Sequence, residues 1–402
     1  MVKQLVLHLG DRKTGSTAIQ DALAAGAITC PTMQIFYPAT TNHIPLAKTL
    51  TVKSQSPQRD MRFTKIAKRI ARSDADIAVI SAEHFEVVNP VLLQDVLTRY
   101  FPDLAGNIRL IAYVRPHAER LVSNYAEAVK LGQYDGDLHS YHIQRLEQKP
   151  LHYTDRFSRW RQVFGAAFTL RPFVRKTLAG GDIVQDFAQF LLGDTPHTVT
   201  AGPPSNPSMS LQDLAMVRHL QSQVGARPNL SKFQVSMGKS LGQLLAAAQD
   251  STRTPIKLAM DTDLAKAVQT AYADDARSLD AAFFAPDTPM QDALQSSRDR
   301  AVAAPQSIAI TDHLSPAAIR MVDVWAGLLC SQPAANGALL RETLKNGPQA
   351  AAKSGKNAGG KQQAGQKGAT QKGANKKGAG KKGKKAGKPQ KEFTEDDLLD
   401  LF

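Results

Sequence analysis

The first 200 residues predict an α/β fold with a mostly parallel sheet, because short apolar runs alternate with helical patterns. Each apolar run is largely hydrophobic throughout, which is typical of strands covered by helices on both faces. A break rich in proline and serine follows at 201–207, and the patterns after it are mainly helical. The expected strands are 5–9, 76–81, 108–114 and 167–174.

Composition divides the 402 residues into four stretches. Residues 1–200 are expected to form the α/β core, and 201–345 a mainly helical region that completes the domain. Residues 346–391 consist mostly of Lys, Gly, Ala and Gln, so they cannot bury a core and are expected to be disordered. Residues 392–402 form a short segment that mixes acidic and apolar side chains. In the helical region, apolar periodicity covers 211–224, 264–284 and 316–329.

The basic character of the chain is concentrated in its C-terminal part. Fourteen lysines and no acidic residue occur between Lys345 and Lys391, and five acidic residues follow at 392–402. Removing those charges from the formal net charge of +14 leaves only +5 on residues 1–344. The high net charge therefore does not make the folded part a nucleic-acid binder. The lysine-rich segment suits an acidic polymer or an anionic membrane surface as its partner, and the alternative is a solubilising tail with no fixed partner.

Cysteine content and hydropathy indicate a soluble protein of a reducing compartment, and we expect a cytoplasmic location. The two cysteines, Cys30 and Cys330, form neither a disulfide framework nor a metal-binding spacing. The apolar run Leu5–Leu9 is far shorter than the roughly twenty residues that cross a bilayer, and no later run approaches that length. Trp160 and Trp325 have apolar neighbours at helical spacing and are expected in the core.

The segment after the first strand predicts an anion-binding site. Gly10 and Gly15 bracket a turn between an apolar strand and the start of a helix, where free backbone N–H groups and the helix dipole attract negative charge. The two glycines have the spacing of a nucleotide-binding P-loop, Gly-x-x-x-x-Gly-Lys-Ser/Thr. Ser16 stands where the P-loop lysine belongs, however, and the lysine lies inside the loop as Lys13.

A second segment also brings a strand to a helix. The strand 108–114 ends at Arg115, Pro116 suits the first turn of a helix, and Ser123 lies about two turns further on. A guanidinium and a hydroxyl at this spacing can hold a second phosphate. A nucleotide hydrolase would instead place a metal-binding acidic residue at the end of such a strand. We therefore expect no metal ion.

Together the two segments resemble the PAPS-dependent sulfotransferases. The residues Lys13-Thr14-Gly15-Ser16-Thr17 are similar to the family's 5′-phosphosulfate loop, Lys-Ser/Thr-Gly-Thr/Ser-Thr. Arg115, followed by Ser123 eight residues later, is similar to its 3′-phosphate motif. Weaker similarity to bacterial members runs through 151–193 and 205–210, so the resemblance covers about half of the chain.

The resemblance implies a P-loop-like three-layer sandwich that transfers a sulfuryl group from PAPS to a hydroxyl or amine of a carbohydrate or similar acceptor. The product would be 3′,5′-adenosine bisphosphate. The loop residues would bind the 5′-phosphate through backbone N–H and hydroxyl groups, Lys13 would stabilise charge as the S–O bond breaks, and Arg115 with Ser123 would bind the 3′-phosphate. The loop residues concerned are Thr14, Gly15, Ser16 and Thr17.

The acceptor's proton requires a base, which in the family is a His or Glu near the carboxyl edge of the sheet. Glu83 and His84 follow the strand 76–81, and Glu83 is the preferred candidate. His43 is a third candidate because it follows the first helix and could fold over the donor. A glutamate after a strand is also a common helix N-terminal residue, and a single histidine is more often a surface or core residue.

A second class of function is a binding protein. In that alternative the P-loop-like body has lost catalysis, and the basic segment tethers it to an anionic polymer. Lys13, Arg115 and Ser123 favour the enzyme, since a decayed site has little reason to keep all three. The sequence identifies neither the acceptor nor the oligomeric state.

Overall fold

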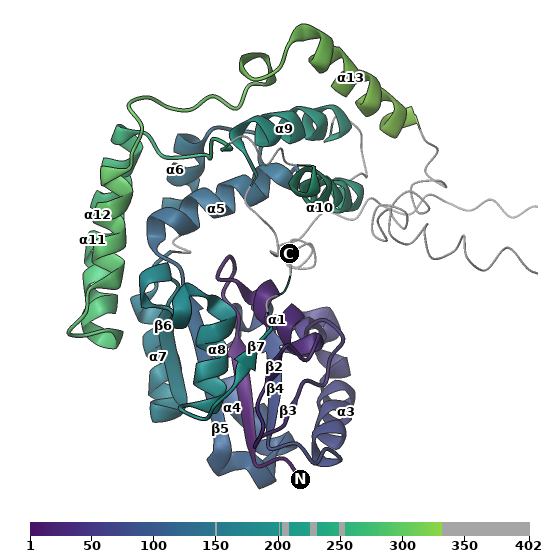
Figure 1. The fold of residues 1–402 in the computed structure, drawn as a ribbon, viewed down its shortest axis with the longest axis vertical. Coiled ribbons are helices and arrows are strands. Elements are labelled where there is room, and N and C mark those ends of the chain that lie inside the picture. Colours follow the sequence, from purple (N-terminus) through teal and green to yellow (C-terminus); the bar gives the residue numbers. More distant parts are fainter. Residues whose placement is uncertain (149–150, 201, 203–208, 226–230, 249–253, 332–402) are drawn as a thin grey trace, which may run out of the picture.

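The computed structural model describes residues 1–148, 151–200, 202, 209–225, 231–248 and 254–331, and it confirms the α/β fold. Five parallel strands form the central sheet in the order β3-β4-β1-β5-β6 (Figure 1). Four of them correspond to the four expected strands, and the additional strand β3 contains only two residues. The strands are β1 (Gln4–Leu9), β3 (Ile35–Phe36), β4 (Ile77–Ala82), β5 (Ile108–Val114) and β6 (Phe168–Pro172).

Helices cover both faces of the sheet, which confirms the three-layer architecture. Along β1, alternate side chains point to opposite faces, so that Leu5 and Leu7 join one apolar cluster and Val6 joins another. The Val6 face packs against α1 (Ser16–Ala24) and α8 (Ile183–Leu192). The opposite face packs against α3 (Arg59–Ala71), α4 (Pro90–Tyr100), α5 (His117–Lys130) and α7 (Thr154–Phe164).

The described residues between 209 and 331 are mainly helical, as the apolar periodicity predicts. Its helices are α9 (Leu211–Gly225), α10 (Ser231–Ala247), α11 (Thr262–Phe283), α12 (Pro289–Asp299) and α13 (Pro316–Ser331). Leu264, Tyr272 and Leu279 of α11 belong to the same apolar cluster as Leu5 and Leu7 of β1. This helix therefore shares its core with the α/β part. Figure 1 shows α9, α10 and α13 at one end of the molecule and the sheet at the other.

The remaining elements are short. Helices α2 (Ile44–Thr51) and α6 (Leu138–Gln148) and a separate antiparallel pair, β2 (Ile28–Thr29) with β7 (Thr198–Val199), complete the regular structure. Seven 3-10 helices connect these elements within the described residues. They are η1 (Lys53–Gln58), η2 (Glu83–Val87), η3 (Pro102–Asn107), η4 (Gly165–Ala167), η5 (Arg175–Thr177), η6 (Ala179–Gly181) and η7 (Ile310–Asp312).

The expectations for the two tryptophans have different outcomes. Trp160 is buried, with 2% of its surface exposed, as expected. The expectation for Trp325 was wrong: it lies on the outer face of α13 and is 61% exposed, because the opposite face of that helix packs on the protein.

The segments 346–391 and 392–402 lie outside the described residues. Among the residues that the structure describes, no helix is both long and apolar enough to cross a bilayer.

Candidate anion-binding site

The candidate site lies where three neighbouring strands end. The chain leaves β1 at Gly10, β4 at Glu83 and β5 at Arg115. These strands are adjacent and parallel, so their carboxyl ends lie at one edge of the sheet, the usual place for ligands in such folds. The topology therefore gathers the three predicted segments at one place.

The loop between β1 and α1 requires glycine at two positions. Gly15 precedes the first residue of α1 with a φ of +79°, a conformation that favours glycine. At Gly10, a Cβ atom would lie 2.9 Å from the Cα of Glu83, which is closer than such atoms approach in proteins. Lys13 also has a positive φ, of +64°. The loop is thus held in a conformation that turns its backbone tightly in front of α1.

The loop hydroxyls differ in their accessibility. Thr14 Oγ1 donates a hydrogen bond of 2.6 Å to the Asp11 carbonyl oxygen, and Ser16 Oγ donates one of 3.2 Å to the same atom. Both side chains are buried and stabilise the turn itself. Thr17 is exposed in the first turn of α1. Among the three hydroxyls, that of Thr17 is the most accessible to an incoming anion.

The structure brings the two predicted anion-binding segments into contact. The Arg115 guanidinium donates one hydrogen bond of 3.0 Å to the Lys13 carbonyl oxygen and another of 3.3 Å to Ser123 Oγ on α5. The guanidinium also lies over the ring of Phe173, 5.7 Å from its centroid. Burial lowers the pKa of Arg115 from its ordinary value of 12.5, and the guanidinium still carries its charge at neutral pH. Arg115 thus links the loop to α5.

The Lys13 side chain points toward α5. Its Nζ forms an ion pair of 2.7 Å with Glu127, which also pairs with Lys130 at 2.5 Å. Burial lowers the pKa of Lys13, and the Glu127 carboxylate opposes that effect. Burial raises the pKa of Glu127, but the two lysines outweigh it, so its pKa falls below the usual value. An anion arriving at Lys13 therefore competes with a neighbouring carboxylate.

The three candidate bases occupy different environments. Glu83 begins η2 beside Gly10, and burial raises its pKa although Lys13 and Arg12 partly counteract the rise. His84 is buried in the same short helix, with 7% of its surface exposed. His43 precedes α2, and its Nδ1 accepts a hydrogen bond of 3.1 Å from the Ser81 backbone N–H. Burial lowers the pKa of His43 to about 4, so it is neutral at pH 7.

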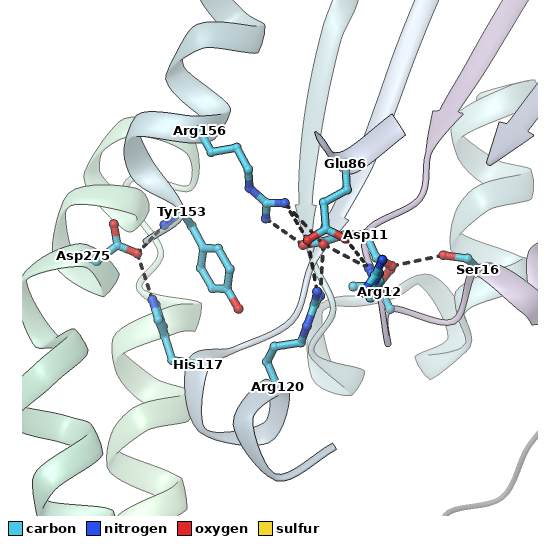
Figure 2. A network of polar contacts seen from close by, with 10 residues as sticks. Asp11, Arg12, Ser16, Glu86, His117, Arg120, Tyr153, Arg156 and Asp275 are labelled. Carbon is cyan, nitrogen blue, oxygen red and sulfur yellow. Dashed lines mark hydrogen bonds and ion pairs between the residues drawn. The ribbon is translucent and has the colours of Figure 1, made fainter. Parts of the chain in front are cut away.

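Asp11 of the loop belongs to a largely buried cluster of four charged residues that the sequence analysis did not identify (Figure 2). Asp11 pairs with Arg120 of α5 at 3.1 Å and with Arg156 of α7 at 2.9 Å. Glu86 of η2 pairs with the same arginines, at 3.2 Å and 3.1 Å. The cluster therefore joins the anion loop to η2, α5 and α7.

Electrostatics explains why this cluster can be buried. Burial raises the pKa of Asp11, but Arg120 and Arg156 overcome that effect and hold its pKa well below the usual range. Burial and the nearby Asp11 charge raise the pKa of Glu86, and the two arginines reduce that rise. Two cations face two carboxyl groups, so each buried charge has partners of opposite sign. Nothing in the spacing of these residues along the sequence signals the contact.

A second polar contact connects this cluster region to α11. His117 Nε2 lies 2.9 Å from Asp275, whose carboxylate also accepts the backbone N–H groups of Tyr153 and Thr154 at 2.8 Å and 3.0 Å. The Tyr153 ring lies between this contact and the four charges (Figure 2). Burial lowers the pKa of His117 although Asp275 opposes the change. Asp275 therefore fastens α11 to the starts of α5 and α7.

Comparison with known proteins gives a distant structural likeness. No protein-family model matches the chain, and no curated protein matches it. The fold is similar to the crystal structure of a sulfotransferase from Alicyclobacillus acidocaldarius, with 12% sequence identity and a TM-score of 0.38. The match covers 73% of this chain and 100% of that one. At that identity and TM-score, the likeness assigns no ligand and no residue role to this chain.

Proposed function

We propose that this protein is a sulfotransferase that moves a sulfuryl group from PAPS to a hydroxyl or amine of a carbohydrate or similar acceptor. The observation that carries the proposal is the Arg115 guanidinium, which bonds the Lys13 carbonyl oxygen and Ser123 Oγ at once. PAPS carries a 5′-phosphosulfate and a 3′-phosphate. Two adjoining anion-binding segments suit such a donor better than a nucleotide with a single phosphate chain.

In the proposed reaction, the acceptor oxygen or nitrogen attacks the sulfur atom, and the bond from sulfur to the bridging oxygen of the 5′-phosphate breaks. The leaving group is 3′,5′-adenosine bisphosphate, which takes the bonding electrons. Lys13 leaves its ion pair with Glu127 and binds the oxygens of the transferred group. There it stabilises the negative charge that develops in the transition state. The backbone N–H groups of Gly15 and Ser16, with the exposed Thr17 hydroxyl, bind the 5′-phosphate.

The acceptor proton goes to a base at the same edge of the sheet. Glu83 is the preferred base, because it lies beside Gly10 and burial raises its pKa, which makes its carboxylate a stronger proton acceptor. His84 and His43 are the alternatives. The low pKa of His43, about 4, makes it a weaker base than an ordinary histidine. The reaction as proposed needs no metal ion.

Calorimetry with two nucleotides tests the proposal. We expect the wild type to bind 3′,5′-adenosine bisphosphate at least tenfold more tightly than ADP, since only the former carries a 3′-phosphate for Arg115. Arg115→Ala is expected to remove most of this preference, a loss of about 2 kcal/mol for a charge-assisted contact. Arg99→Ala, which removes an exposed arginine on α4, serves as the control. Equal affinity for both nucleotides, or an unchanged preference in Arg115→Ala, would contradict the proposal.

A transfer assay separates the enzyme from the binding-protein alternative. We expect the wild type to transfer radiolabelled sulfate from PAPS to at least one member of a carbohydrate and phenol panel. Tight, Arg115-dependent binding of the bisphosphate together with inert PAPS across that panel would favour a protein that binds the nucleotide without catalysis.

A further inference from the structure

Helix α13 has an inner face that packs on the protein. Val322 and Ala326 join an apolar cluster with Val224 of α9 and Met237 of α10. Asp323 adds a contact of 2.7 Å to His219 Nε2 of α9. These contacts fix how α13 is rotated about its own axis. One face is covered, and the other is turned outward.

The outward face of α13 is apolar. Met321 is 58% exposed, Val324 51%, Trp325 61% and Leu328 54%. Their spacing of three, one and three residues places all four on one side of the helix, and we call them the outer stripe. Figure 1 shows α13 at the outer end of the molecule, with α9 on its inner side. Four adjacent large apolar side chains on a helix surface mark an interaction site rather than ordinary exposure.

The sequence that follows α13 supplies positive charge. Residues 345–391 contain fourteen lysines and no acidic residue, and they begin fourteen positions after the helix ends at Ser331. Arg320 adds an exposed cation on α13 itself. An apolar helix face combined with a polybasic segment is the two-part signal of proteins that bind anionic bilayers.

We propose that the outer stripe and the lysine-rich segment together dock the protein on an anionic lipid surface. The outer stripe would enter the boundary between head groups and acyl chains, with α13 parallel to the membrane and Trp325 at the interface that tryptophan prefers. The lysines would neutralise the lipid head groups. This role is separate from the proposed transfer reaction and does not depend on it.

Charge and polarity favour a bilayer over two other occupants. A nucleic acid or another acidic polymer would satisfy the lysines but leaves the outer stripe exposed to water. A second copy of this chain would cover the stripe, but it would bring two fourteen-lysine segments to the same end of one assembly. An anionic bilayer offers an apolar layer and negative charge at one surface, so it satisfies both features.

Vesicle flotation with the full chain tests the proposal. We expect binding to phosphatidylcholine vesicles that contain phosphatidylserine, little binding to phosphatidylcholine alone, and weaker binding at high salt because ions screen the lysines. The double variant Met321→Ser, Trp325→Ser is expected to lose about tenfold or more in vesicle affinity. Its matched control, Met61→Ser with Ile143→Ser, also changes two exposed apolar residues and should bind normally.

A second variant tests the charged part. Replacing six lysines of the lysine-rich segment with glutamine is expected to lower affinity for anionic vesicles by about tenfold or more. The six are Lys376, Lys377, Lys381, Lys382, Lys384 and Lys385. Circular dichroism and thermal unfolding of every variant should match the wild type, since each substitution lies at an exposed site or beyond α13.

Tryptophan fluorescence tests whether the outer stripe of α13 enters the membrane interface. The chain has two tryptophans, and Trp160 is buried, so a change on adding vesicles would come from Trp325. We expect a blue shift and quenching by brominated lipids in the wild type. The variant Trp325→Phe should still float with vesicles while that shift disappears.

Several results would overturn the proposal. One is full vesicle binding by the double variant, and another is binding of heparin or RNA with no affinity for anionic vesicles. Concentration-dependent dimers in sedimentation velocity that the double variant abolishes would assign the outer stripe to a second copy. A blue Trp325 emission without vesicles that turns red in the double variant Phe393→Ser, Leu398→Ser would assign the outer stripe to the chain's own C-terminal segment.

Discussion

At the scale of single residues, Lys13 has the environment that most affects the proposed chemistry. Its positive φ and its ion pair with Glu127 hold the ammonium group against α5. Burial lowers the pKa of Lys13, and the Glu127 carboxylate opposes that change in a place that is only partly exposed. A cation in such surroundings stabilises a developing negative charge more strongly than one in water does.

The variant Lys13→Ala tests the role of that charge. We expect the rate constant for sulfate transfer to fall about 100-fold or more, the usual cost of removing one group that stabilises a transition-state charge. Binding of 3′,5′-adenosine bisphosphate should change little, because that product lacks the sulfuryl group. Lys65→Ala removes an exposed lysine on α3 and provides the control. An undiminished rate in Lys13→Ala would remove this residue from the mechanism.

The raised pKa of Glu83 predicts that the transfer rate depends on pH. Its pKa is raised by burial, so the ionised form that accepts a proton decreases as the pH falls through that raised value. The transfer rate should therefore rise with pH across this range. Glu83→Gln should remove that limb of the profile and lower the rate about 100-fold or more, whereas Glu147→Gln on the exposed side of α6 should not. A surviving limb in Glu83→Gln would point to His84 or His43 instead.

At the scale of elements, the carboxyl ends of β1, β4 and β5 form one site because the strands are neighbours. The close approach of Gly10 to Glu83 joins the anion loop to η2, which carries two candidate bases. Asp11 and Glu86 then fix that pair of segments to α5 and α7 through two arginines. The loop and the two candidate bases on η2, Glu83 and His84, are therefore expected to move as one unit.

A substitution at Gly10 tests whether its close approach to Glu83 holds the loop and η2 in place. In Gly10→Ala, the new methyl group would lie 2.9 Å from a backbone atom of Glu83, so the loop or η2 must shift. We expect affinity for 3′,5′-adenosine bisphosphate to fall about tenfold, in line with an overpacking cost of about 1–3 kcal/mol. Gly106→Ala meets no atom within 4 Å and should bind like the wild type. Equal calorimetric affinities for the two variants would show that the loop tolerates the shift.

At the scale of the whole molecule, Asp275 couples the helical region to the α/β core. Its carboxylate on α11 accepts two backbone N–H groups at the start of α7 and contacts His117 at the start of α5. Burial alone would raise its pKa, but His117 and the two N–H groups lower it to about 2, from an ordinary 3.8. The ionised carboxylate therefore stabilises the fold.

The sign of this pKa shift predicts how stability depends on pH. The contribution of Asp275 is fully present above about pH 4 and is lost as the pH falls toward 2. We expect Asp275→Asn to reduce the free energy of unfolding at pH 7 by about 1–2 kcal/mol, after allowance for solvent screening. Urea denaturation at several pH values measures this. Asp274→Asn, at an exposed neighbour on α11, is the control, and an identical loss there would contradict the assignment.

The four main strands, the glycine spacing of the loop and the eight-residue step from Arg115 to Ser123 were all predicted from the sequence. These features depend on local backbone chemistry and on periodicity over a few residues, which the sequence shows directly. Three-dimensional structure alone decided the partners of Asp11 and Asp275. Their partners lie more than seventy positions away in most cases, and no local pattern encodes which buried charges meet.

Trp325 illustrates the same difference between what a local sequence pattern predicts and what the packing decides. Its spacing in α13 correctly indicated an amphipathic helix, but a helix with apolar residues on two sides does not reveal which side faces the protein. The packing of Val322 and Ala326 on α9 and α10 settled that choice and left Trp325 exposed. Burial depends on how the elements pack, so the spacing of apolar residues along a helix cannot show which of them are exposed to water.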